Sequence, residues 1–182
     1  MLELSLHILD IVENSVRAKA QSVHITLTED PEHDHLVLEI RDDGQGMSKT
    51  EISRVMDPFY TTKTVRRVGL GLPMLAQAAQ NAGGCFEIES KPGGGTIVKV
   101  AFQLSHIDRQ PLGNLPGTLV TLITGNPDTR FVYRHQRLQK LYILDTDEIK
   151  RDIEDIPINH VEVLKWIQKD VAQGLKEICA EA

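Results

Sequence analysis

The chain has 182 residues, of which 41% are hydrophobic and 25% are charged, and its net charge at pH 7 is −6. This composition is that of a globular protein with one large domain, or with one domain and a smaller appendage. It excludes a disordered chain, and the acidic balance argues against general binding to nucleic acid.

No segment of the sequence predicts a membrane location. The first residues lack a basic region and a long apolar stretch, so they do not resemble a signal peptide. No apolar run approaches the roughly 18 residues that a membrane-spanning helix needs. Cys85 and Cys179 stand alone, without the spacing of a metal site. We therefore expect a cytoplasmic protein with reduced thiols and no membrane partner.

Residues 1–104 predict alternating helices and strands. Apolar residues at helical spacing predict a helix from about residue 4 to residue 19, with Ser5 as its candidate cap. Alternating patterns predict strands over 22–28 and 36–41. Ser48 and Glu51 form a capping box that opens a short helix. A helix over 72–82 and strands over 85–90 and 96–104 follow.

Residues 105–182 form a C-terminal extension of strands and a long helix. It begins with a connector, rich in proline and glycine, that ends near residue 117. The patterns predict strands over 118–124, 130–135 and 140–144, and a long amphipathic helix over 159–179. A segment of this size makes only a marginal core alone, so we expect it to dock on residues 1–104.

A sharp turn follows the second expected strand. Asp42 stands at the strand end, and Gly44 and Gly46 let the backbone approach a ligand with no Cβ in the way. A carboxylate in this place can accept a hydrogen bond from an exocyclic amine such as that of adenine. Taken alone, Asp-x-Gly-x-Gly is also an ordinary turn.

Three further blocks accompany this turn. Glu13, Asn14 and Ser15 lie in the first helix, and Asp57-Pro-Phe-Tyr-Thr-Thr-Lys63 is followed by Val68-Gly-Leu-Gly-Leu72. In order and spacing the four blocks resemble the N, G1, F and G2 boxes of the GHKL ATPases. That superfamily contains DNA gyrase, the heat-shock chaperone ATPase, MutL and the histidine kinases. The blocks around Lys63 and Leu72 look most like the histidine-kinase branch, whereas Val-Glu-Asn-Ser looks like MutL.

The resemblance covers roughly residues 1–104 and implies a fold and two cofactors. The fold is the Bergerat arrangement, an α/β (α+β) two-layer sandwich whose mixed, mostly antiparallel sheet carries helices on one face. The cofactors are ATP and magnesium.

The resemblance also assigns roles on the first helix. Asn14 matches the family's magnesium ligand, and Asp10 stands where the MutL and gyrase branches place a glutamate that polarises the attacking water. Asp10 is therefore a candidate general base, although it is one methylene shorter, and the alternative is that it only orients a group next to the water. Arg17 matches a position where histidine kinases often place lysine near the phosphates, and an ordinary exposed arginine is the alternative. His7 is expected to be a packed histidine rather than a phosphoacceptor.

The resemblance places an ATP lid between residues 57 and 69. Lys63 is the candidate contact to the γ-phosphate, and Arg67 stands where kinases of this type usually have a glycine. Thr96 matches a threonine that supports the adenine site. The cofactor-binding set that the resemblance implies is Asn14, Arg17, Asp42, Gly44, Gly46, Met47, Phe59, Thr62, Lys63, Arg67, Gly69, Leu70, Gly71, Leu72 and Thr96.

We expect a magnesium–ATP-binding regulatory protein, a stand-alone kinase-like ATPase domain that hydrolyses ATP slowly or transfers phosphate to a protein partner. One alternative is a protein serine kinase of the anti-sigma type. The other is a non-catalytic switch, in which ATP controls an interaction surface. Residues 105–182 are expected to carry the partner-specific role.

Overall fold

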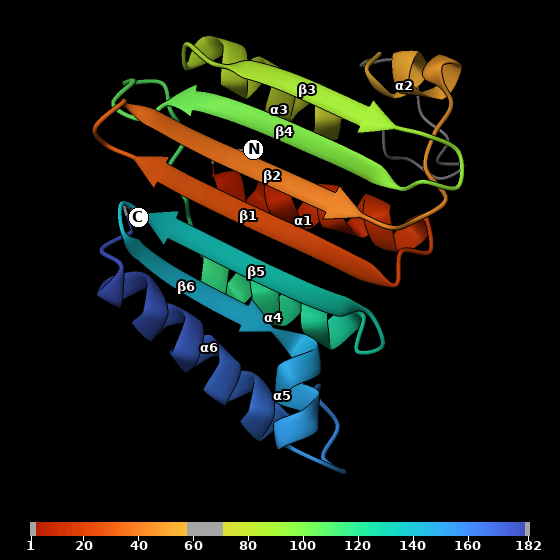
Figure 1. Ribbon diagram of the computed structural model, residues 1–182, viewed down its shortest axis with the longest axis vertical. Helices are drawn as coiled ribbons and strands as arrows, with labels where there is room; N and C mark the ends of the chain where they lie inside the picture. Colours follow the sequence, from red (N-terminus) through yellow and green to blue (C-terminus); the bar gives the residue numbers. More distant parts are fainter. Residues whose placement is uncertain (1–2, 58–70, 181–182) are drawn as a thin grey trace.

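The computed structural model describes residues 3–57 and 71–180. Figure 1 shows a single sheet with helices packed against it. The elements, in chain order, are α1 (Leu4–Arg17), β1 (Ser22–Asp30), β2 (His35–Asp42), α2 (Lys49–Val55), α3 (Gly71–Asn81), β3 (Cys85–Ser90), β4 (Thr96–Gln103), α4 (Leu115–Gly125), β5 (Arg130–Arg137), β6 (Lys140–Asp145), α5 (Thr146–Asp152) and α6 (Val161–Glu177).

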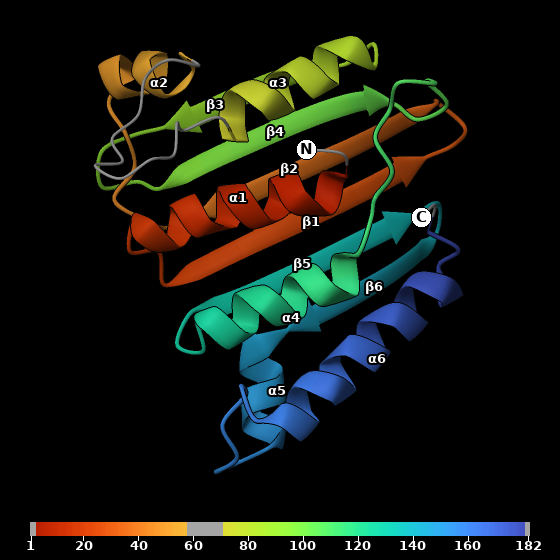
Figure 2. The ribbon, with the colours of Figure 1, turned by 180° about the vertical axis from the view of Figure 1, so that it is seen from behind.

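The sheet has six strands in the order β3-β4-β2-β1-β5-β6. β1 and β5 are parallel, and the other neighbouring pairs are antiparallel. Helices α1, α3 and α4 cover one face, as the rear view in Figure 2 shows. The expected sandwich, with a mixed and mostly antiparallel sheet and helices on one face, is confirmed.

Period-two alternation in the strands creates the core between the sheet and the helices. In β1 the side chains of Val23, Ile25 and Leu27 are fully buried, and those of the intervening residues point to the other face. Helix α1 buries Leu4 and Ile8 against this surface. The inward side of the sheet therefore anchors α1, on which Asp10 and Asn14 lie.

The prediction of a strand over 118–124 is wrong, because this segment belongs to helix α4. Its buried residues recur at helical spacing, and the Asn114 side chain caps the helix by accepting a hydrogen bond from Gly117 N at 3.0 Å. The β-branched residues between them favoured a strand, but a short apolar run does not distinguish a strand from a buried helix by periodicity alone.

Two further expectations about local structure need correction. Ser5 does not cap α1, since the N-cap is Glu3 and makes no side-chain capping bond. The carbonyls of Pro111 and Leu112 instead accept hydrogen bonds from the first helical amides at 3.0 and 2.9 Å. Helix α5, which begins at Thr146, was not predicted. The other helices and strands lie within about two residues of their expected bounds.

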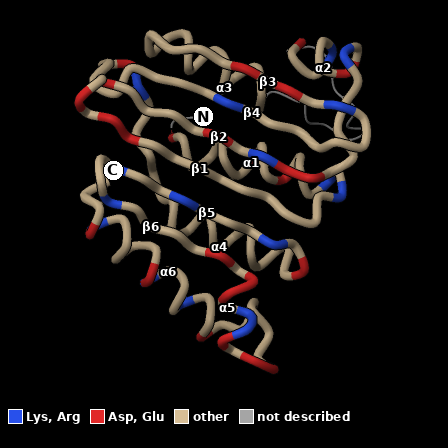
Figure 3. The backbone as a smooth tube through the Cα atoms, viewed as in Figure 1, with Lys and Arg blue, Asp and Glu red and all other residues tan. Residues whose placement is uncertain are grey.

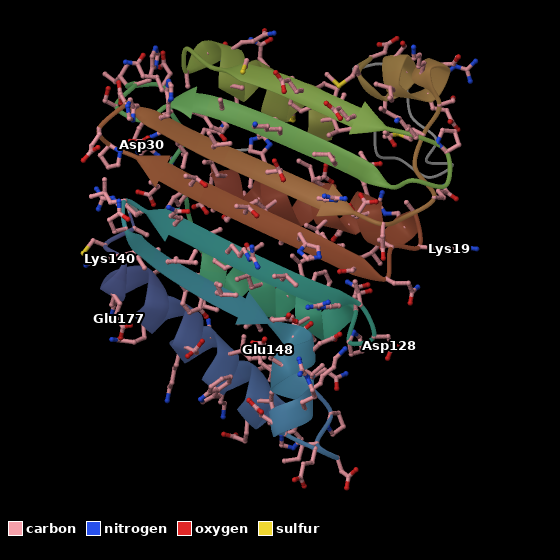
Figure 4. The ribbon with its side chains drawn as sticks, in the orientation of Figure 1. Lys19, Asp30, Asp128, Lys140, Glu148 and Glu177 are labelled. Carbon is pink, nitrogen blue, oxygen red and sulfur yellow. The ribbon has the colours of Figure 1, made fainter. Side chains whose placement is uncertain are left out.

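Strands β5 and β6 extend the sheet beyond β1. Buried polar groups join β5 to β1, because His135 Nε2 lies 2.7 Å from Glu29 Oε1 and His135 Nδ1 lies 2.7 Å from the Tyr133 hydroxyl. At the other end of the extension, Lys140 donates a hydrogen bond of 2.9 Å to the carbonyl of Glu177 (Figure 4). Strands β5 and β6 therefore share one hydrogen-bonded sheet with the first four strands.

Candidate functional site

A cavity of about 430 Å³ lies between the inward side of β2 and β4 and the helices α1, α2 and α3. The residues around it come from five elements and the turn after β2. They are Asp10, Ile11, Asn14, Ser15, Arg17, Ala18, Ile40, Asp42, Gln45, Gly46, Met47, Glu51, Arg54, Val55, Gly71, Leu72, Thr96 and Val98.

Asp42 is a buried carboxylate on the cavity wall, with 9% of its surface exposed. Its Oδ2 accepts a hydrogen bond of 2.7 Å from the Ser15 hydroxyl, and its Oδ1 accepts one of 2.9 Å from Gly44 N. These bonds fix the carboxylate and leave further lone pairs free to accept. Ile11, Ile40 and Val98 place apolar surface in the same cavity. An aromatic ring that carries a hydrogen-bond donor fits this combination.

The turn after β2 is held against the β3–β4 hairpin. Gly46 has a φ of +64°, and a Cβ on it would lie 1.9 Å from the carbonyl oxygen of Lys91. Met47 N donates a hydrogen bond of 2.8 Å to the Ser90 hydroxyl, which lies 2.9 Å from Thr96 Oγ1. Thr96 is also the cross-strand partner of Asp42. The turn and Thr96 thus form one connected side of the cavity.

Asn14 lies one turn after Asp10 on the same side of α1. Its Oδ1 accepts a hydrogen bond of 2.9 Å from Arg17 Nη1. Arg17 also pairs with Glu13 Oε2 at 3.1 Å, on the exposed surface of the helix. Asn14 therefore lines the cavity with its side-chain oxygen hydrogen-bonded to a guanidinium group.

Asp10 meets the start of α3. A Cβ built on Gly71 would lie 1.7 Å from Asp10 Oδ2, so only glycine fits at this position with Asp10 in place. The Asp10 carboxylate makes no hydrogen bond or ion pair within the described residues. The N-terminal amides of an α-helix favour anions. The structure therefore brings a carboxylate and a helix N-terminus to one end of the cavity.

The structure brings nine of the expected residues to one cavity: Asp10, Asn14, Arg17, Asp42, Gly46, Met47, Gly71, Leu72 and Thr96. Gly44 lies beside it through its bond to Asp42. The remaining expected residues, Phe59, Thr62, Lys63, Arg67, Gly69 and Leu70, lie outside the described residues, and so does most of the expected lid.

Ser15 was missed as a site residue. A signal was available, because Ser15 is a small polar residue on the apolar side of an amphipathic helix, where it needs a hydrogen-bond partner. The sequence did not identify Gln45, Arg54 and Val55 either. These residues line the cavity only because of the way the turn and α2 fold over the sheet. His7 is packed as expected, with 1% exposure, and its Nε2 lies 2.9 Å from Gln110 Oε1.

Comparison with known proteins agrees with this geometry. The family model of histidine kinase-, DNA gyrase B- and HSP90-like ATPases matches residues 2–106. Sporulation kinase C of Bacillus subtilis is 29% identical over 96 residues, which are 53% of this chain and 22% of the relative. Sensor histidine kinase YxdK of the same organism is 34% identical over 97 residues, 50% of this chain and 30% of the relative. The match thus covers less than a third of either relative's length.

A solved structure extends the likeness in fold beyond the matched region. The N-terminal domain of a DNA repair protein has a TM-score of 0.54 and 15% identity, and the match covers 80% of this chain and 53% of that one. Within the described residues no helix is long and apolar enough to cross a membrane. Because the family model matches more than half of the residues of this chain, the chain belongs to the family of histidine kinase-, DNA gyrase B- and HSP90-like ATPases.

Proposed function

We propose that the cavity binds ATP with magnesium, with the adenine amine donating to Asp42. The observation that carries this proposal is the buried Asp42 carboxylate, fixed by Ser15 and Gly44 beside apolar side chains. A fixed acceptor in an apolar cavity selects a flat ring with a donor at its edge, because a ring without the donor would leave the carboxylate unpaired.

The residues present also fit magnesium on the α1 side of the cavity. Magnesium prefers oxygen ligands and keeps several waters, and the Asn14 oxygen faces the cavity from α1. When bound, the ion neutralises charge on the phosphates. Arg17 now holds the Asn14 oxygen, so we propose that it releases that oxygen and turns towards the phosphates when the nucleotide binds.

Asp10 is proposed as the general base for hydrolysis. The reaction needs a carboxylate that can accept a proton from the attacking water close to where the phosphates bind. Asp10 lies against Gly71 at the start of α3, and it is not engaged in a competing ion pair among the described residues. Its position one helical turn from Asn14 places both oxygens on the same side of α1.

Phosphate transfer to a protein partner is the second candidate. The relatives named above are kinases, and they match this chain only in their ATPase region. We propose that residues 1–104 hold the nucleotide and that residues 105–182 supply the partner-specific role, whether the product is free phosphate or a phosphoprotein. A non-catalytic switch would use the same cavity without either product.

Incubation with γ-labelled ATP separates these outcomes. Hydrolysis predicts slow release of free phosphate by the protein alone, and this release should fall at least tenfold in Asp10→Asn while ATP still binds. Glu13→Gln is the matched control, because Glu13 is an exposed carboxylate on the same helix. Label that appears only on an added partner protein favours transfer. If the protein binds ATP but yields neither free phosphate nor a phosphoprotein, catalysis is contradicted and the non-catalytic switch is the remaining function.

A further inference from the structure

The face of the sheet opposite the helices carries two separate groups of charged residues. Figures 1 and 2 show that α1, α3 and α4 all lie on the other side. Strand alternation therefore points every second side chain away from the core on this face. Figure 3 shows basic residues on β2, β4 and β5 and acidic residues on β2 and β3.

Three arginines surround His24 on this open face. His24 in β1 pairs with Arg41 of β2 on one side and with Val132 of β5 on the other. Arg130 and Arg134 stand two residues before and after Val132, so their side chains share its face. Arg41, Arg130 and Arg134 are termed the arginine cluster below.

Acidic neighbours compensate only part of this positive charge. Arg130 pairs with Asp145 at 2.5 Å and lies 3.7 Å from Asp147. Arg41 and Arg134 are exposed, and the side chain of neither forms an ion pair or hydrogen bond within residues 3–57 and 71–180. Two of the three guanidinium groups therefore face solvent with all their donors available.

His24 reports the resulting electrostatic potential. Burial lowers its pKa, and Arg130, Arg134 and Arg41 lower it further, while Asp145 opposes them in part. Its Nε2 lies 3.2 Å from the hydroxyl of Ser22, a neutral neighbour on the same strand. A protonated imidazole is disfavoured here because the surrounding potential is positive.

We propose that the arginine cluster is a docking site for an acidic segment of a partner protein. Guanidinium groups match carboxylates in bidentate geometry, and arginine is the residue favoured for such contacts at interfaces. Arg41 and Arg134 stand on strands separated by β1 and opposite residues two apart along it, so their backbone positions lie about 12 Å apart by the usual strand spacing and rise. Carboxylates that alternate along an extended segment are about 7 Å apart, so two or three of them span the cluster.

Charge on the rest of the open face selects a short acidic segment over a long polyanion. Glu39, Glu87 and Glu89 lie together on β2 and β3, with Lys99 of β4 between them. A nucleic acid strand crossing the cluster would meet these carboxylates, and the chain as a whole has a net charge of −6. A protein segment can be acidic over the arginines and neutral or basic beyond them.

This site is distinct from the nucleotide cavity and goes beyond the proposed function. Arg41 and Asp42 are consecutive in β2, so their side chains point to opposite faces of the sheet. Docking at Arg41 therefore leaves the Asp42 side of the strand open and does not require ATP.

The test follows the His24 proton resonances by NMR in the full, nucleotide-free chain at low salt. The probe is hexaglutamate. Its binding should raise the pKa of His24, because the added carboxylates offset the arginine charge. The double variant Arg41→Gln/Arg134→Gln should raise this pKa without any probe and should weaken hexaglutamate binding about tenfold. Lys169→Gln/Lys176→Gln removes the same charge from the exposed side of α6 and is the matched control.

Three results would overturn the proposal. The first is a His24 titration that hexaglutamate leaves unchanged. The second is an equal loss of binding in the Lys169→Gln/Lys176→Gln control, which would mean that only overall charge matters. The third is a larger pKa rise with a thymidine hexanucleotide or with inorganic phosphate at the same concentration of negative charge, since the occupant would then be a nucleic acid or a free ion.

Discussion

The Ser15 hydroxyl donates a hydrogen bond of 2.7 Å to Asp42 Oδ2, and this contact links helix α1 to the end of β2. Both side chains are buried, with 4% and 9% of their surface exposed. The two halves of the proposed site are therefore joined by this contact: α1 carries Asp10 and Asn14, and β2 carries Asp42, the proposed adenine acceptor. A shift of the helix along the sheet would disturb both at once.

Ser15→Ala should weaken ATP binding by about 1 kcal/mol, because Asp42 would keep only the Gly44 amide to fix its orientation. The melting temperature should also fall by a few degrees, since a buried hydrogen bond to a charged group is lost. Calorimetric titration with ATP measures the first effect. Ser53→Ala is the control, because the Ser53 hydroxyl bonds a backbone carbonyl on the exposed helix α2. Equal ATP affinities in the wild type and in Ser15→Ala would show that the Ser15–Asp42 hydrogen bond does not contribute to ATP binding.

Asn14→Ala should abolish the gain in ATP affinity that magnesium provides, while binding of ADP without metal changes little. The physical reason is the loss of the side-chain oxygen that we propose as a magnesium ligand. Glu13→Ala is a matched control, since Glu13 and Asn14 both accept a hydrogen bond from Arg17. Titrations with and without magnesium make the comparison. Unchanged magnesium dependence in Asn14→Ala would place the metal on other ligands.

Asp145→Asn should lower stability by about 1 kcal/mol at pH 7 and reduce the loss of stability in acid. The hydrogen bond from Arg130 lowers the pKa of Asp145 below its ordinary value of 3.8, against the opposing effect of burial. A lowered pKa in the folded state gives stability that is complete above the unfolded pKa. That stability is lost as the pH falls through the folded value.

Urea unfolding between pH 7 and pH 2 measures this pH dependence. Asparagine can still cap α5 in place of Asp145, so the cap is retained and the change isolates the ion pair. Asp152→Asn, at the exposed end of α5, is the control. A variant whose stability falls with acid as steeply as the wild type would show that the ion pair does not contribute.

Truncation after Leu104 should destabilise the remaining chain and expose an apolar surface. Strand β1 would lose its parallel neighbour β5, and buried Glu29 would lose His135. The first amides of α1 would lose the carbonyls of Pro111 and Leu112. Thermal unfolding and sedimentation measure the effect. A truncated protein that stays monomeric and melts at the wild-type temperature would show that residues 1–104 do not depend on the extension for their stability.

The fold was largely predictable from the sequence because the strands obey a clean two-residue alternation. One row of apolar side chains points inward and one polar row points outward in Ser22–Asp30 and His35–Asp42. The capping box of Ser48 and Glu51 predicts the start of α2. Helix α4 was not predictable in the same way. Its β-branched residues favour a strand, and the helix is stabilised by packing against α1 and α6.

The candidate site was predictable where a residue's role is tied to a local pattern. Asp42 with Gly44 and Gly46, and the one-turn spacing of Asp10 and Asn14, are visible in the sequence. The Ser15 bond, the contact of Asp10 with Gly71 and the paired state of Asn14 depend on how α1 lies on the sheet. The arginine cluster could not be predicted because it depends on strand order. Strand β5 follows β2 by almost ninety residues of sequence, but only β1 separates the two strands in the sheet.

Calorimetric titration of the wild type and of Asp42→Asn with magnesium–ATP tests the central claim most directly. The asparagine keeps the size of the side chain, but its amide donors oppose the adenine amine where the carboxylate accepts. The wild type should bind ATP, and Asp42→Asn should lose about 1.5–3 kcal/mol of affinity with its fold intact by circular dichroism. Wild-type affinity in Asp42→Asn, or no ATP binding by the wild-type protein, would contradict the account.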